Sequence, residues 1–509
     1  MNKQPAIALR GITKSFGNIV ANNNIDLSVH RGEILALLGE NGSGKTTLMN
    51  ILAGIYQPDS GDIFIGGEKA AIRAPEDANR LGIGMIHQHF KLVDVHTAAD
   101  NIILGAEPKG LFLRKNRYDK VREISARFGL SIDPKKKVYN MSVGEKQTVE
   151  ILKVLYRGAN ILILDEPTAV LTVQEIKQLF AILRRMREEG CAVIIITHKL
   201  SEVMEISDRV TILRKGESVA TVETAASDIR SLTELMVGRP VELSIDRPER
   251  TPGGTLLEVH HLSVENEEGV RALEDVSMHL ESGEILGVAG VAGSGQRELC
   301  ETIAGLMPIK EGAILYQNQN IENMTPREIF KKGISMSFIP EDRLGMGLAA
   351  SMGIVDNMLL KTYQDCPGLF LKKQAARKMA QTVTDKLHIS TASMDAPVSL
   401  MSGGNVQKVL LGREIESKPK VLITAYPVRG LDINTSYVIY DALNDQKKAG
   451  TGVLFICEDL DVMLELCDRI MVLCHGRVTG IVDAKSTTKE ELGLLMTDAH
   501  GKGVDTDAE

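Results

Sequence analysis

The sequence contains two related halves, and this duplication limits the folds open to the chain more than any other feature. The segment DRVTILRKGE at 208–217 resembles DRIMVLCHGR at 468–477, and MSVGEKQ at 141–147 resembles MSGGNVQ at 401–407. Both pairs lie 260 residues apart, whereas RGEILALLGENGSGKTTL and SGEILGVAGVAGSGQREL, which begin at 31 and 282, lie 251 residues apart. These offsets predict one domain duplicated in tandem, not a solenoid of many short repeats.

The repeat pattern predicts a first domain at 1–240 and a second at 256–497. The segment between them, RPVELSIDRPERTPGG, is polar and rich in proline and glycine, so we expect a short exposed linker at 241–255. The last residues, DAHGKGVDTDAE, predict a frayed acidic tail at 498–509. A chain of 509 residues accommodates two domains of this size.

Within each half, short aliphatic runs alternate with segments of helical periodicity. EILALLG, NILILDEP and CAVIIITH predict buried parallel strands, and GKTTLMNILAG and EIKQLFAILRRMREEG predict helices. This alternation favours an α/β fold, in which phosphate chemistry gathers at the ends of strands.

Composition excludes several other classes of protein. Six cysteines without a CxxC pair make structural zinc improbable and fit reduced thiols, and the net charge of −8 argues against non-specific nucleic-acid binding. The N-terminus lacks the apolar run of a signal peptide, and no segment approaches the roughly 20 apolar residues of a spanning helix. We therefore expect a protein that does not itself cross a membrane, although it can dock on one that does.

Residues 39–46, GENGSGKT, match G-x-x-x-x-G-K-[ST] between a predicted strand and a predicted helix, which is the context this phosphate-binding loop requires. Gly42 and Gly44 allow backbone N–H groups to surround phosphate oxygens at the N-terminus of the helix. Lys45 is expected to reach the β- and γ-phosphates, and Thr46 to ligate Mg²⁺. A glycine-rich turn with a chance lysine is the alternative, and the flanking elements make it improbable.

Four aliphatic residues lead into Asp165 and Glu166, which predicts carboxylates at a strand end. Asp165 is suited to holding Mg²⁺ and Glu166 to polarising the attacking water, although ILILDEP read alone also fits a strand ending in a solvated turn. His198 follows another predicted strand and can contact a γ-phosphate, although a lone histidine is more often structural. Gln88 is a weaker candidate, and the HQH at 87–89 offers no third ligand for a metal.

With these motifs the chain resembles the ATP-binding subunits of ABC transporters, twice over and along nearly all of its length. The resemblance implies two tandem P-loop ATPase domains, each with a mixed or parallel sheet core and a helical subdomain, paired head to tail as an intramolecular pseudo-dimer. The family's signature motif falls on MSVGE and MSGGN, its adenine-stacking aromatic on Phe16, its Q-loop glutamine on Gln88, its switch histidine on His198 and its D-loop aspartate on Asp432.

The second half departs from the family pattern wherever phosphate or magnesium would be handled. It has Gln296 and Arg297 for Lys45 and Thr46, Ala425 and Tyr426 for Asp165 and Glu166, Glu458 for His198, Glu267 for Phe16 and Glu341 for Gln88. Loss of the lysine and gain of three acids disfavour a highly anionic ligand. We therefore expect no hydrolysis at the second P-loop.

The first half departs elsewhere, with Val143 and Glu145 in its signature and Thr172 at the D-loop position. A β-branched residue is a poor substitute where backbone must approach phosphate. In the family's head-to-tail dimer, the first P-loop would face the intact second signature, and the second P-loop the altered first one. The resemblance thus implies one working composite site and one degenerate site. The alternative is a relic second half beside a first half that dimerises with itself, which a short tether disfavours.

The candidate residues fall into three groups. The catalytic candidates are Lys45, Gln88, Glu166 and His198. The ATP-binding candidates are Phe16, Gly39, Glu40, Asn41, Gly42, Ser43, Gly44, Lys45, Thr46 and Thr47 from the first half, and Ser402, Gly403, Gly404, Asn405 and Asp432 from the second. The Mg²⁺ candidates are Thr46, Gln88 and Asp165.

The resemblance implies the ATP-hydrolysing motor of a membrane importer, with ATP and Mg²⁺ as cofactors. Its implied partners are integral-membrane permease subunits and a solute-binding lipoprotein, with no nucleic acid, and its implied place is the cytoplasmic face of the cell membrane. Phrases such as MIHQHFKLVDVHTAADNIILG and DEPTAVLT resemble the nucleoside-importing branch of the simple-sugar family. A monosaccharide importer is the alternative, and a soluble ribosome-associated tandem ATPase, with its long charged linker and two competent sites, fits less well.

Overall fold

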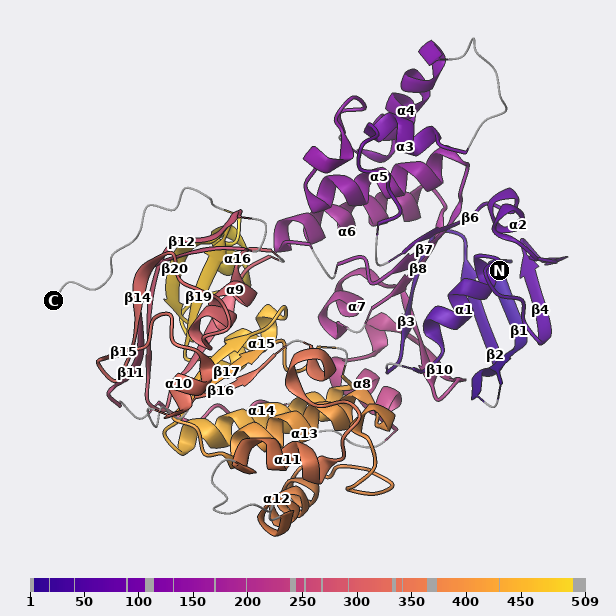
Figure 1. Cartoon of the computed structure of the whole chain (residues 1–509). Helices are drawn as coiled ribbons and strands as arrows, with labels where there is room; N and C mark the ends of the chain where they lie inside the picture. The colour runs from indigo at the N-terminus through magenta and orange to yellow at the C-terminus, as the bar shows by residue number, and fades with distance from the viewer. Residues whose placement is uncertain are drawn as a thin grey trace. The chain divides into compact units, whose positions relative to one another are not determined.

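A computed structural model of the chain shows two compact units, Met1–Glu242 and Leu243–Glu509 (Figure 1). The boundary between them falls inside the predicted linker. The structure describes residues 4–17, 19–40, 42–87, 90–105, 114–130, 132–168, 171–197, 199–238, 244–250, 253–266, 269–291, 293–331, 336–340, 342–363, 373–429 and 431–497.

Two sheets form the first unit. The antiparallel sheet has the order β2-β1-β4-β5, with β1 Pro5–Phe16, β2 Ile19–His30, β4 Ser60–Ile65 and β5 Glu68–Ala70. The second sheet has the order β10-β9-β3-β8-β7-β6, with β3 Glu33–Leu38, β6 Ile83–Ile86, β7 Ile161–Asp165, β8 Ala192–Ile196, β9 Arg209–Arg214 and β10 Glu217–Glu223. Its strands run parallel except at the β9–β10 hairpin.

The helices of the first unit follow the strands of the mixed sheet. They are α1 Lys45–Leu52, α2 Pro75–Arg80, α3 Ala98–Ile103, α4 Arg114–Phe128, α5 Val143–Tyr156, α6 Val173–Glu188, α7 Leu200–Ile206 and α8 Ile229–Val237. The predicted strands and helices coincide with β3, β7, β8, α1 and α6. All positions of β3 and β8 are buried, as expected of aliphatic strands covered on both faces of a sheet.

The second unit repeats this topology. Its antiparallel sheet has the order β12-β11-β14-β15, with β11 Thr255–Glu265, β12 Arg271–Glu281, β14 Glu311–Tyr316 and β15 Gln319–Asn320. Its mixed sheet has the order β16-β17-β18-β13-β19-β20, with β13 Ile285–Ala289, β16 Met336–Ile339, β17 Val421–Ala425, β18 Gly452–Ile456, β19 Arg469–Cys474 and β20 Arg477–Asp483. The chain is therefore an α/β protein with two tandem domains, as the duplication predicts.

The second unit has the same set of helices and an additional π-helix, Arg343–Gly347. The helices are α9 Gln296–Ile303, α10 Pro326–Lys331, α11 Ile354–Thr362, α12 Lys373–Lys386, α13 Gly403–Glu416, α14 Ile433–Lys448, α15 Leu460–Leu466 and α16 Lys489–Leu495. Among the described residues, no helix is long and apolar enough to span a bilayer.

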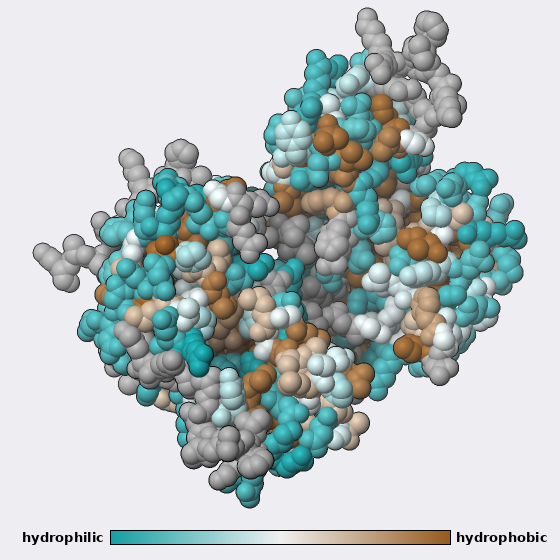
Figure 2. All heavy atoms as spheres, in the orientation of Figure 1, coloured by the Kyte–Doolittle hydropathy of each residue, from teal (hydrophilic) through white to brown (hydrophobic). Residues whose placement is uncertain are grey.

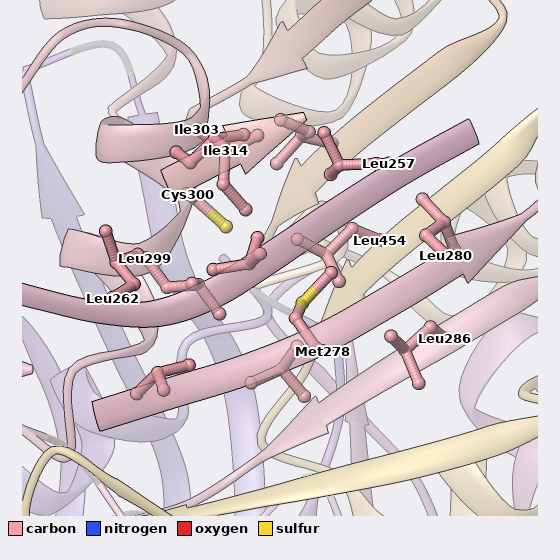
Figure 3. Close-up of a cluster of buried hydrophobic side chains, with 14 of the residues drawn as sticks. Leu257, Leu262, Met278, Leu280, Leu286, Leu299, Cys300, Ile303, Ile314 and Leu454 are labelled. Carbon is pink, nitrogen blue, oxygen red and sulfur yellow. The ribbon is translucent and has the colours of Figure 1, made fainter. Parts of the chain in front are cut away.

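Aliphatic side chains fill the space between sheet and helix, which fits a chain without tryptophan. Figure 3 shows this for the second unit, where Leu257, Met278 and Leu280 of the antiparallel sheet pack toward Leu299, Cys300 and Ile303 of α9. Burial of such side chains is worth about 1.5–3 kcal/mol each and fixes α9 against both sheets. The position of α9 in turn fixes the loop that precedes it, which is the second P-loop.

Candidate functional site

The loop between β3 and α1 forms the first phosphate cradle. Gly42 and Gly44 have φ of 81° and 96°, which is the left-handed region that favours glycine. A Cβ on Gly44 would lie 2.3 Å from the carbonyl oxygen of Ala21, and one on Gly39 would lie 2.3 Å from that of Leu213. Glycine is therefore required both for the turn and for the close approach of neighbouring backbone, and N–H groups at the start of a helix after such a turn are suited to binding phosphate oxygens.

Lys45 begins α1 and folds back over the loop. Its ammonium donates to the carbonyl oxygens of Gly39 at 2.7 Å and Glu40 at 2.9 Å, and it lies 3.5 Å from the Ser43 hydroxyl. Burial lowers the pKa of this ammonium, and the carboxylates of Glu166, Asp165 and Glu40 oppose that shift. The lysine is thus held in the loop by neutral carbonyls, which a phosphate oxygen can replace with a stronger partner.

Phe16 ends β1 and is 43% exposed, which suits a ring that stacks on a base. Tyr56 meets it edge to face at 5.2 Å, and the Lys14 ammonium lies 5.6 Å from its ring centre. Sequence reasoning missed Tyr56 and also Asn22, whose buried amide donates to the carbonyl oxygen of Gly44 at 3.1 Å. Neither belongs to a recognisable motif, because Tyr56 meets Phe16 from the loop after α1 and Asn22 of β2 bonds the P-loop, each across at least 20 residues of sequence.

The order of parallel strands brings the predicted carboxylates to the P-loop edge of the sheet. Leu37 of β3 pairs with Ile196 of β8, and Ile196 pairs with Asp165 of β7, so the carboxyl ends of three adjacent strands lie level. Burial raises the pKa of Asp165 to about 6, helped by the charge of Glu166 and opposed by Lys45. A divalent cation would offset the negative charge of the Asp165 and Glu166 carboxylates. The exposed hydroxyl of Thr46, in the first turn of α1, is a second candidate ligand for such a cation.

Glu166 occupies a strained turn directly after β7. Its φ is 47°, unusual for a residue with a side chain, and its N–H donates to the carbonyl oxygen of Ile196 at 2.9 Å. In the second unit Tyr426 has the same turn, with φ of 50° and an N–H bond of 3.0 Å to Ile456. The backbone of the site is therefore retained in both units, and only the side-chain chemistry differs.

A buried carboxylate joins the loops that follow β7 and β8. Glu202 of α7 accepts from the hydroxyls of Thr168 at 2.7 Å and Thr197 at 3.3 Å, and all three side chains are buried. Thr168 follows Glu166 by two residues, and Thr197 precedes His198. The corresponding residues of the second unit, 260 positions later, are Val428, Cys457 and Val462. The bonds of Glu202 with Thr168 and Thr197 are therefore specific to the first unit, the one in which the strand ends in Asp165 and Glu166.

The second P-loop keeps its backbone but loses its cation. Gly293 and Gly295 have φ of 84° and 102°, close to the values in the first loop. Gln296 replaces the lysine, and its buried amide donates to the carbonyl oxygen of Val291 at 3.1 Å. Arg297 pairs with Glu301 at 2.7 Å. A neutral amide supplies little attraction for triphosphate, so this loop cannot replace Lys45 in function.

The strand end beside the second P-loop is filled by other contacts. Ala425 ends β17 and is buried, Tyr426 lies 5.7 Å from the guanidinium of Arg429, and Arg429 lies 3.7 Å from Glu458. No carboxylate stands at the position of Asp165, because Ala425 occupies it. The predicted degenerate strand end therefore carries an aromatic and ion-pair cluster in place of a metal ligand.

The first signature is blocked by an acid that sequence reasoning missed. Glu175 of α6 accepts from the backbone N–H of Gly144 at 3.1 Å, at the start of α5. Glu145 occupies the same helix start, where it accepts from the N–H of Ser142 at 2.8 Å and pairs with Lys136 at 2.7 Å. Two carboxylates thus stand where the N-terminus of a helix would otherwise attract a phosphate.

The second signature differs at both acidic positions, with Asn405 for Glu145 and Thr435 for Glu175. The first turn of α13 has no acidic residue, and the position of Glu175 is held by Thr435, whose hydroxyl donates to Asp432 at 2.8 Å. Ser402 is the N-cap of α13, and the amide of Asn405 donates to its hydroxyl at 3.0 Å. The α13 start is therefore a more favourable place for an anion than the α5 start.

Asp432 is the N-cap of α14 and accepts from the N–H of Thr435 at 2.8 Å. This cap is a local structural role, because it pairs a backbone N–H donor that the first turn of the helix leaves without a partner.

Asn41, Gln88 and His198 lie outside the described residues, as do Glu267 and Glu341. The strands that precede Gln88 and His198 in the sequence, β6 and β8, end at Ile86 and Ile196, at the same edge of the sheet as Asp165.

Comparison with known proteins agrees with this geometry. A family model described as ABC transporter matches residues 22–169 and again 273–427, which covers both P-loops and both strand ends. The chain belongs to the ABC transporter family. It is an ATP-binding import subunit with ATPase activity coupled to transport, built from two fused domains of this family.

Relatives match along the whole chain. It is 45% identical to the guanosine import ATP-binding protein NupO of Bacillus subtilis, over 96% of this chain and 97% of the relative. It is 42% identical to the nucleoside import ATP-binding protein NupA of Lactococcus lactis, over 97% and 99%. It is 38% identical to the ribose import ATP-binding protein RbsA 1 of Rubrobacter xylanophilus, over 97% and 98%.

Proposed function

We propose that this subunit drives the import of nucleosides, with one hydrolytic site made from the first P-loop and the second signature. The observation that carries the proposal is the division of intact parts between the units. The first unit holds Lys45, Asp165 and Glu166 but blocks its own signature with Glu175. The second unit lacks those three side chains but has an unblocked signature at the start of α13. Only the crossed pairing unites all the parts that phosphoryl transfer requires.

The residues of the first P-loop are suited to ATP bound with Mg²⁺. Residues 39–47 would surround the phosphates, with Lys45 toward the β- and γ-phosphates and Phe16 against the adenine. Thr46, Asp165 and Gln88 would hold Mg²⁺, whose chemistry is to neutralise charge on the phosphate oxygens. Burial, and then the charge of Glu166, raise the pKa of Asp165, and a bound cation would stabilise the ionised carboxylate that both disfavour.

The first unit then supplies the groups that act on water. Glu166 polarises the attacking water from its fixed turn, and His198 and Gln88 have the roles of the family's switch histidine and Q-loop glutamine in orienting that water. From the second unit, Ser402, Gly403, Gly404 and Asn405 close over the γ-phosphate with the helix dipole of α13, and Asp432 completes the contact. One ATP is hydrolysed for each closure, while the second P-loop hydrolyses none.

The partners we propose are a membrane permease, which this subunit contacts from the cytoplasmic face, and a solute-binding lipoprotein. In Figure 2, hydrophobic residues gather on the helical part of the first unit. Between β6 and α4, Val95 is 67% exposed and Leu104 is 48% exposed. Apolar exposure of this kind marks surfaces that bind other proteins.

A monosaccharide importer is the second candidate, because the ribose relative covers the chain at 38% identity. The test is the ATPase rate of the complex isolated with its permease and binding protein, with guanosine, ribose, galactose or riboflavin added in turn. Stimulation by the nucleoside alone supports the proposal. Stimulation by a sugar alone would keep the motor but refute the nucleoside assignment.

A further inference from the structure

Residues 244–250, here called the strap, are bound to the surface of the second unit. The guanidinium of Arg247 donates to the carbonyl oxygens of Leu464, at 3.2 Å, and Cys467, both at the C-terminal end of α15. Part of the predicted exposed linker is thus held by the second domain, through residues that lie more than 200 positions away.

Two side chains of α14 reach back to the strap. Asn444 donates from its amide to the carbonyl oxygen of Asp246 at 3.1 Å, and Lys447 donates to that of Pro248 at 2.7 Å. The Lys447 side chain is only 1% exposed and also pairs with Asp468 at 2.7 Å. At the end of the strap, Arg250 pairs with Glu281 of β12. Side chains and backbone of α14, α15 and β12 therefore bind the seven residues of the strap.

The first unit shows how the same surface is completed without a strap. Arg184 of α6 donates to the carbonyl oxygen of Glu205, near the C-terminal end of α7, at 3.2 Å. The residue 260 positions later is Asn444, which is too short for this role. In the second unit Arg247 of the strap bonds the same helix end, through the carbonyl oxygens of Leu464 and Cys467, which flank the position that matches Glu205. Arg187, the counterpart of Lys447, pairs with Asp208 while remaining 33% exposed.

We propose that α14 and α15 form a binding surface for the chain's own residues 244–250, which fixes the tether between the two domains at its second end. The proposal rests on one difference between the units: the arginine that bonds the end of the short helix lies on α6 in the first unit (Arg184) and on the strap in the second (Arg247). It makes the strap a specific partner of this surface, because Asn444 both leaves room for Arg247 and bonds the neighbouring Asp246.

The tether is the free chain between α8 of the first unit and the first residue held by the second unit, and binding of the strap shortens it. From Gly238, which follows α8, to Ser244 the chain has six residue steps, about 20 Å when extended. From Gly238 to Thr255, where β11 begins, it has 17 steps, about 60 Å. Effective concentration falls with roughly the −3/2 power of length, so release of the strap would lower it about fivefold. Its effect on ATP hydrolysis rests on the proposed composite site, whereas the binding surface does not.

The binding surface is tested by hydrogen exchange of the full chain, followed by mass spectrometry. Arg247→Ala should speed exchange at the end of α15 by roughly ten- to a hundredfold, as expected for lost bonds from a charged donor, and leave α7 unchanged. Arg184→Ala is the matched control and should speed exchange in α7 only. Adding Asn444→Arg to Arg247→Ala should restore slow exchange in α15. Unchanged exchange in Arg247→Ala would overturn the proposal.

The double variant Arg247→Ala/Asn444→Arg also distinguishes the role of the strap in the tether from its role in stabilising α15. In this variant the end of α15 is bonded again, while the strap has lost the side-chain bonds of Arg247 and Asn444. Cleavage by glutamyl endopeptidase at the exposed Glu249 should accelerate, and the ATP concentration for half-maximal turnover should rise up to about fivefold. Unaltered cleavage would refute the claim that residues 244–250 are bound to the second unit. An unaltered half-maximal ATP concentration would refute the claim that this binding shortens the tether. A wild-type chain without ATPase activity would instead refute the proposed function, with the exchange and cleavage results still standing.

Discussion

Replacing Glu202 by valine, the residue at the matching position of the second unit, should destabilise the first unit. The carboxylate is 7% exposed and accepts from the hydroxyls of Thr168 and Thr197, which are 3% and 2% exposed. Each of the two hydroxyls left without an acceptor costs about 1–3 kcal/mol, so the expected loss is roughly 2–6 kcal/mol. For a unit of about 240 residues, each kcal/mol corresponds to a fall of about 2–4 °C in the unfolding midpoint.

The sharper test is a triple variant that copies the second unit. Glu202→Val with Thr168→Val and Thr197→Cys removes the carboxylate and both hydroxyls together, which is close to neutral for stability when shape is kept, apart from the partly exposed ion pair of Glu202 with Lys199 at 3.4 Å. The second unit holds the same backbone turn with Val428, Cys457 and Val462, so the triple variant should recover most of the lost midpoint. Calorimetry of the full chain measures both transitions.

The reciprocal change assigns the calorimetric transitions to the two units. Val462→Glu places a carboxylate beside Val428 and Cys457, where the threonine donors are missing, and should lower the other transition. A single Glu202→Val variant as stable as the wild type would refute the reasoning. So would a triple variant no more stable than the single one, because the cost would then not come from the orphaned hydroxyls.

Three further predictions concern the composite site. Thr435→Glu should bond the N–H of Gly404 as Glu175 bonds that of Gly144 and lower turnover about 10²–10³-fold. Glu175→Thr is the control: it removes the acid of the α6 capping box and so costs some stability, but it should not lower turnover. Equal rates in both variants would contradict the blocked-signature account. Gln296→Lys should not restore hydrolysis at the second P-loop, as measured in a Glu166→Gln background, because Ala425 supplies no metal ligand. The pKa of Asp165 is raised from 3.8 to about 6, so its proton stabilises the folded chain at low pH, and this contribution is lost as pH rises through 6. Mg²⁺-dependent ATP binding should accordingly weaken as pH falls through about 6, and more steeply in the wild type than in Asp165→Asn, where only the ATP phosphates titrate. Equal pH dependence in the two proteins would count against Asp165 as a ligand.

The sequence was sufficient for the fold and for the core of the first P-loop. The spacing of GENGSGKT between an aliphatic run and a helical pattern predicted β3, the loop and α1, and ILILDE predicted β7 with its terminal carboxylates. These predictions succeed because local periodicity and glycine spacing determine each feature within a few residues. The duplication predicted the second unit and its altered side chains in the same way.

Features that depend on distant contacts could not be predicted. Glu175 stands in the first turn of a helix, where an acid is ordinary, and its bond to Gly144 arises only when α5 and α6 meet. The strap has the composition of an exposed linker, and its partners Asn444 and Lys447 lie on α14. One signal was available in each case, namely the difference between the halves at matching positions, such as Glu175 against Thr435 and Arg184 against Asn444.

The most direct test of the composite site compares turnover in Glu166→Gln and Tyr426→Phe, the matching positions of the two strand ends. Both variants would be assayed as the complex with permease and binding protein, at saturating ATP. The account predicts that Glu166→Gln lowers turnover at least about a hundredfold while ATP stays bound, since the carboxylate that polarises water is lost. Tyr426→Phe should leave turnover almost unchanged. Equal losses in the two variants would contradict the account, because hydrolysis would then depend on both P-loops.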